Sequence, residues 1–69
     1  MPRHLNPLLE AARQRAADLA LAVPNDELAA AKFQISKKLG QDFPTVPRYK
    51  RMAIAAKAAR LEYERRFPR

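Results

Sequence analysis

The first apolar pattern of the chain runs from Pro7 to Val23 and has the period of an α-helix. Leucines and alanines recur there at spacings of three and four residues, with charged and amide side chains on the other side. Asn6 is a suitable N-cap, and Pro7 suits the first helical position because its missing N–H needs no partner there. Pro24 follows the pattern directly. The sequence therefore predicts an amphipathic helix over residues 7–23.

A second helix is predicted over residues 26–39. Asp26 and Glu27 lie where the positive end of its dipole favours acidic side chains. Gly40, the single glycine of the chain, follows the pattern and is interpreted as the left-handed residue that ends the helix. The apolar stripe of this helix consists of Leu28, Ala31, Ile35 and Leu39.

Phe33 lies on the far side of the second helix from this stripe. One interpretation is a partly exposed ring, or a ring that the following loop covers. The other interpretation is a contact residue for a partner. The sequence leaves both open.

The third and longest helix is predicted over residues 47–66, after a linker that contains Pro44 and Pro47. Its start stays open between Thr45 as the cap and Pro47 as the first helical residue. Two apolar strips lie on this helix, so it is expected either to lie between two neighbouring helices or to keep one strip for a partner. The larger strip comprises Tyr49, Met52, Ala53, Ala56, Ala59, Tyr63 and Phe67. The smaller strip comprises Ile54, Ala58 and Leu61.

Three helical patterns in 69 residues predict a single small all-α domain over 1–69. Its arrangement is expected to be a three-helix bundle or a helical hairpin with a long helix, and residues 1–5 and 67–69 are expected to be mobile tails. Fourteen alanines contribute little apolar area to the core. A homodimer or a docked partner is therefore an expected source of additional stability.

Positive charge is concentrated in the C-terminal half of the chain. Residues 1–31 carry three arginines against four acidic residues, whereas residues 32–69 carry eleven lysines and arginines against three acidic residues. Such asymmetry is typical of proteins with an anionic partner, and a solvated surface that keeps a small protein soluble is the alternative. The predicted phosphate contacts are Lys37, Lys38, Arg48, Lys50, Arg51, Lys57, Arg60, Arg65 and Arg66, and Lys32 and Arg69 belong to the same basic group.

Three features qualify this interpretation. Tyr49 stands between two basic residues and is a candidate for stacking on a base, but the face it shares with Met52 predicts a core position. Glu62 and Arg66 form an i,i+4 pair expected to contribute about 0.2–0.5 kcal/mol. The linker before the third helix is longer than the turn of a helix-turn-helix motif, so that resemblance is weak.

The sequence is compatible with two functions. The preferred one is a small nucleic-acid-binding protein, regulatory or architectural, with DNA and RNA as alternatives. The other is a protein-interaction adaptor or inhibitor, of the kind that phages and mobile elements encode, which docks on a larger host assembly. Its candidate contacts are Phe33, Ile54 and Leu61.

The sequence offers little for catalysis or metal binding. There is no cysteine, and the single histidine, His4, falls in the predicted N-terminal tail. Glu62 and Glu64 are two residues apart on a helix and point in different directions. No apolar run has the length of a signal peptide or of a membrane span. We therefore expect a cytoplasmic binding protein, not an enzyme, without catalytic residues, metal or cofactor.

Overall fold

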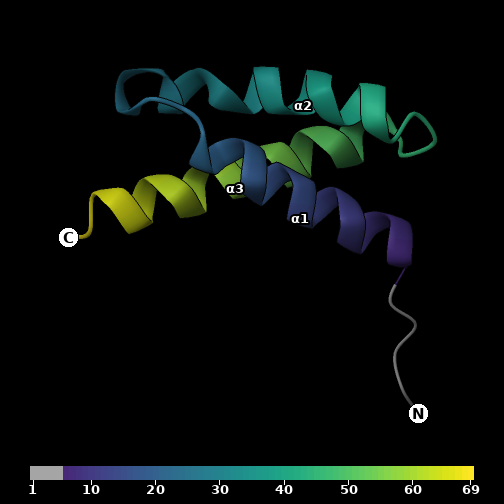
Figure 1. Cartoon of the computed structure of the whole chain (residues 1–69), viewed down its shortest axis with the longest axis horizontal. Coiled ribbons are helices and arrows are strands. Elements are labelled where there is room, and N and C mark those ends of the chain that lie inside the picture. Colours follow the sequence, from purple (N-terminus) through teal and green to yellow (C-terminus); the bar gives the residue numbers. More distant parts are fainter. Residues whose placement is uncertain (1–5) are drawn as a thin grey trace, which may run out of the picture.

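The computed structural model describes residues 6–69, which fold into three α-helices and one 3₁₀-helix (Figure 1). α2 and α3 form an antiparallel hairpin, and α1 lies across α3. The prediction of an all-α, three-helix protein is confirmed. The predicted tail over residues 1–5, with His4, lies outside the described residues. The elements are α1 (Pro7–Leu21), η1 (Asn25–Ala30), α2 (Ala31–Asp42) and α3 (Arg48–Arg66).

The start of α1 follows the sequence closely. The Asn6 side chain accepts hydrogen bonds from the N–H groups of Leu8 and Leu9, at 3.0 and 3.4 Å. Pro7 occupies the first turn, as predicted. The helix ends at Leu21, two residues before the predicted end. At the other end of the chain, α3 begins at Arg48 with Pro47 as its N-cap, one residue later than the nearer of the two predicted starts.

The second predicted helix is divided between two elements. The 3₁₀-helix η1 covers its first turns, and α2 continues to Asp42, beyond the predicted end. The interpretation of Gly40 as a left-handed terminator is wrong, because it lies within α2 and has no positive φ. The Arg51 side chain lies against Gly40, where an added Cβ would stand 3.1 Å from Arg51 Cζ and closer still to Nη1. The glycine therefore makes room for a side chain of the facing helix.

The core between the helices is built mainly from small side chains. The large residues that are fully buried are Leu28, Ile35 and Leu39, all from the predicted stripe. Alanines fill most of the rest, since a methyl group lets two helices approach closely. The buried alanines are Ala12, Ala16, Ala20, Ala31, Ala55 and Ala59. A core with so few large side chains gains little apolar burial, so its margin of stability is small.

The buried face of α3 does not include Tyr49, for which a core position was predicted. Tyr49 is 70% exposed, and Tyr63 and Phe67 are also exposed, whereas Ile54 from the smaller strip packs against the core. α3 contacts both α1 and α2, so its buried centre is the narrow face between the two apolar strips. The buried residues of that face are Ala55 and Glu62, together with Ala59 at the edge of the larger strip. Bulky aromatic rings would keep the helices apart there, and they remain outside. Phe67 was predicted both in the larger apolar strip and in a mobile tail, and its ring lies 4.9 Å from the Tyr63 ring.

Candidate nucleic-acid interface

Basic side chains gather along the contact between α2 and α3. Lys32 and Ser36 lie one turn apart on α2, and Met52 and Ala56 lie one turn apart on α3. Two hollows lie next to each other along this contact, and residues of both α2 and α3 line each of them. One hollow lies towards η1, and the other lies towards the loop that joins α2 and α3. We call the two hollows together the basic groove, and name its parts the Arg60 pocket and the Arg51 pocket.

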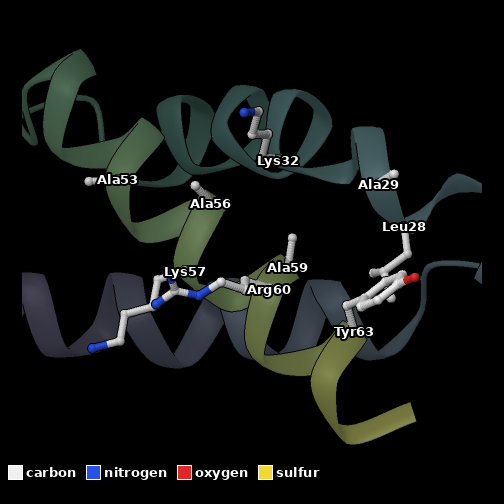
Figure 2. Close-up of a pocket in the computed structure, with 9 residues that line it drawn as sticks. All are labelled: Leu28, Ala29, Lys32, Ala53, Ala56, Lys57, Ala59, Arg60 and Tyr63. Carbon is white, nitrogen blue, oxygen red and sulfur yellow. The ribbon is translucent and has the colours of Figure 1, made fainter. Parts of the chain in front are cut away.

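The Arg60 pocket, of about 520 Å³, lies where η1 and the start of α2 face the middle of α3 (Figure 2). Lys57 and Arg60 project from α3, and Lys32 comes from the facing helix. Leu28 and Tyr63 line it as well. Its floor is made of alanine side chains, namely Ala29, Ala53, Ala56 and Ala59. An alanine floor with cations around it leaves the positive charges accessible from outside.

The Arg51 pocket, of about 490 Å³, lies nearer the hairpin loop. Lys37 on α2 and Arg48 and Arg51 on α3 supply its charges. Its other lining residues are Phe33, Ser36, Gly40 and Met52. The Phe33 ring is 59% exposed. Lys32 Nζ lies 5.3 Å from the centre of that ring, so a side chain of the Arg60 pocket reaches the edge of the Arg51 pocket.

The groove carries six basic side chains and no acidic one among its lining residues. Within residues 6–69, none of the six takes part in an ion pair. The basic residues that form ion pairs with acidic side chains are Arg13, Arg15, Arg65 and Arg66. Unpaired like charges at this density create a positive potential that attracts anions. The six residues are Lys32, Lys37, Arg48, Arg51, Lys57 and Arg60.

The groove brings together five of the nine predicted phosphate contacts and leaves four outside. Lys37, Arg48, Arg51, Lys57 and Arg60 line it. Lys38 is exposed on α2 but lines neither pocket, and Lys50 lies near Leu9 and Arg13 on the side of α3 that faces α1. Arg65 and Arg66, the remaining two, bind the protein's own groups.

Arg66 ties the end of α3 to the end of α1. Its guanidinium donates hydrogen bonds to the carbonyl oxygens of Val23 at 2.6 Å, Ala20 at 3.1 Å and Leu21 at 3.2 Å. It also donates to Asn25 Oδ1 at 2.9 Å and to Glu62 Oε2 at 2.6 Å. Only 15% of the Arg66 side chain is exposed. The expectation that Arg66 contacts phosphate is therefore corrected, because all three of its guanidinium nitrogens already have acceptors within the protein.

Glu62 is the buried partner of this cluster, with 7% of its side chain exposed. Arg65 donates to it through two nitrogens, at 3.0 and 2.5 Å, and Arg66 through a third. These hydrogen bonds lower the pKa of Glu62 from its ordinary 4.5 to about 2, and the bond to Glu62 raises the pKa of Arg65. The pair expected to be a minor surface contact is thus part of a tertiary cluster.

Two residues of the groove were missed or misassigned from the sequence. Lys32 was placed among the basic residues but not among the phosphate contacts, although it lies one turn before Ser36 on the same face of α2. Tyr63 was placed in the larger apolar strip, yet its ring is about half exposed in the Arg60 pocket. The four-residue spacing between Lys32 and Ser36 could have indicated that Lys32 lies on the groove side of α2. Nothing in the local sequence distinguishes an exposed Tyr63 from a buried one.

The three predicted protein-contact residues do not share one surface. Phe33 lies in the Arg51 pocket between α2 and α3. Ile54 packs against the core, and Leu61, 51% exposed, lies over a hollow between α1 and α3. The strip that seemed free for a partner is therefore largely used to hold α1.

Within the part of the chain that the structure describes, no cluster of histidine and carboxylate side chains has the composition of a metal site. None of the helices in residues 6–69 has the length and apolar character needed to cross a bilayer. No protein-family model matches the chain, and neither does any curated protein or solved structure with which it was compared.

Proposed function

We propose that this chain is a nucleic-acid-binding protein whose basic groove holds the phosphate backbone of DNA or RNA. The observation that supports the proposal is the gathering of six unpaired basic side chains along one helix–helix contact, with no carboxylate in the lining. A regulatory or architectural role fits a small chain that gathers six unpaired basic side chains along one groove. The chemistry is binding by phosphate contacts, which position a strand and carry no sequence information by themselves.

Such binding has a characteristic dependence on salt. Each lysine or arginine that neutralises a phosphate releases condensed counterions, and the logarithm of the affinity falls with the logarithm of the salt concentration by about 0.9 per duplex phosphate. If all six groove residues contacted phosphates, affinity would fall about 10³-fold between about 50 and about 200 mM salt. A smaller slope would report fewer contacts.

The test is fluorescence anisotropy with labelled duplex DNA and single-stranded RNA over a salt series. The variant Lys57→Glu/Arg60→Glu removes two charges from the Arg60 pocket. Lys38→Glu/Lys50→Glu is the matched control, because it makes the same change in net charge at residues outside the groove. We expect the first pair to weaken binding much more than the second.

Each outcome has a clear meaning for the proposal. Equal weakening by both pairs would mean that overall charge, not the groove, attracts the strand. An affinity that changes neither with salt concentration nor in either double variant would contradict the proposed function.

A protein partner remains the alternative function, and its support is the exposed Leu61 beside the hollow between α1 and α3. Copurification from a nuclease-treated lysate separates the two, because only a protein partner survives the nuclease. Leu61→Ser is the suitable variant, since a polar residue at Ile54 would disturb the core. The proposed nucleic-acid binding is expected to be unchanged in Leu61→Ser.

A further inference from the structure

We propose that the Arg51 pocket is a binding site for one phosphate group, with the Arg51 guanidinium as its principal ligand. The inference rests on the proposed function in one respect, namely that the phosphate belongs to a nucleic-acid strand that continues along the groove towards Arg60. The phosphate chemistry itself is argued from the pocket alone.

The Arg51 side chain is confined by its surroundings. It is held between α2 and α3, across the backbone of Gly40, where any larger residue would meet the guanidinium. A side chain confined in this way has lost much of its conformational freedom before a ligand arrives. An arginine that is already ordered loses less entropy on binding an anion than a free surface arginine does.

The guanidinium of Arg51 also has a hydrogen-bond donor that residues 6–69 leave unsatisfied. Its Nε atom is buried, and among the described residues it has no hydrogen-bond acceptor. A buried donor without an acceptor is unfavourable, particularly on a charged group. Arg66, the other partly buried arginine of α3, has acceptors for all its nitrogens. Arg51 Nε therefore lacks an oxygen acceptor within the described residues, and phosphate oxygens are acceptors of the kind that the planar guanidinium fork binds.

The surroundings of Arg51 suit an anion as well. Lys37 and Arg48 add two further charges to the pocket, and Ser36 contributes a hydroxyl group. Arg48 is also the first residue of α3, so the positive end of that 19-residue helix opens at the same place, without a side-chain cap. Charge, hydroxyl and helix dipole thus all favour the same kind of ligand.

Phe33 distinguishes the possible sources of the phosphate. Its exposed ring lies in the pocket lining, where a base attached to the bound phosphate has an aromatic surface to stack on. Inorganic phosphate has no base. Phe33→Ala is therefore expected to weaken the binding of a strand and to leave the binding of inorganic phosphate unchanged.

The first arm of the test is a titration of the whole protein with inorganic phosphate, followed in ¹H–¹⁵N spectra that include the arginine Nε–H signals. We expect the Arg51 Nε–H signal to move, and the movement to disappear in Arg51→Gln. Lys38→Gln is the control on the same pair of helices. Arg48→Gln, at an exposed position, is expected to weaken the binding even if Arg51→Gln proves poorly folded. An Arg51 signal that does not respond, or an unchanged affinity in Arg48→Gln and Arg51→Gln, would overturn the inference.

The second arm measures a single-stranded oligonucleotide by anisotropy. Arg51→Gln is expected to weaken it by about ten-fold, the effect of one charged hydrogen-bonded contact. If the strand responds to Lys57→Glu/Arg60→Glu but not to Arg51→Gln, the phosphate site is refuted and the proposed function stands. If inorganic phosphate binds at Arg51 but no strand binds, the site stands and the proposed function fails.

Discussion

Removal of the Arg66 guanidinium is expected to be among the most damaging changes to a charged residue of this protein. Arg66 donates to three main-chain carbonyl oxygens at the end of α1, those of Ala20, Leu21 and Val23. α1 has no basic residue in its own last turn. The favourable interaction between a helix C-terminus and a cation is therefore supplied from the far end of the chain.

The expected size of the effect follows from these contacts. A net contribution of about 1 kcal/mol for each of the three hydrogen bonds predicts a loss of about 3 kcal/mol in Arg66→Ala. A domain of this length has a free energy of unfolding of about 3–10 kcal/mol. The variant is therefore expected to lose about 30% or more of its free energy of unfolding. Arg66→Lys retains the charge but not the planar fork, so it is expected to recover only part of the loss.

The assay is urea unfolding followed by far-UV circular dichroism. Arg65→Ala is the matched control, because it removes the same charge from a neighbouring residue that also binds Glu62. The Arg65 side chain is 64% exposed and makes no hydrogen bond to α1. We expect its urea midpoint to fall less than that of Arg66→Ala, because Arg65→Ala loses hydrogen bonds to Glu62 but no contact with α1. If Arg66→Ala unfolds at the same urea concentration as Arg65→Ala, the assignment of Arg66 as the cap of α1 is refuted.

Three further predictions concern stability. Because the folded pKa of Glu62, about 2, lies below its ordinary 4.5, this carboxylate stabilises the fold above about pH 4.5 and loses the effect as the pH falls towards 2. Glu62→Gln should therefore flatten the decline of the urea midpoint over that window, and an unchanged decline would show that protonation of Glu62 does not cause it. Leu39→Ala removes a fully buried side chain and is expected to cost about 3 kcal/mol in the same assay, whereas a cost below about 1 kcal/mol would show a poorly packed site. Asn6→Ala removes the cap of α1 and is expected to cost about 1 kcal/mol, with Asn6→Asp close to the wild type.

The local features of the fold were accessible from the sequence because each depends on neighbours a few residues apart. The start of α1 follows from Asn6 and Pro7, whose side chains act on the adjoining backbone. The burial of Leu28, Ile35 and Leu39 follows from their helical spacing. The excess of basic residues in the second half needs no structure at all.

The arrangement of those basic residues was decided by the packing of the helices. Lys50 and Arg51 are neighbours in the sequence, yet one faces α1 and the other lies in the groove. The helical period shows which residues of α3 share a face, but it left both apolar strips compatible with burial. Only the positions of α1 and α2 select the alanine-containing face between the two strips as the buried one. The bond from Arg66 to the carbonyl of Ala20 spans 46 residues, a separation over which no local pattern carries information. Sequence alone therefore determined three helices and an excess of positive charge, whereas tertiary contacts decided which charges remain free for an anion.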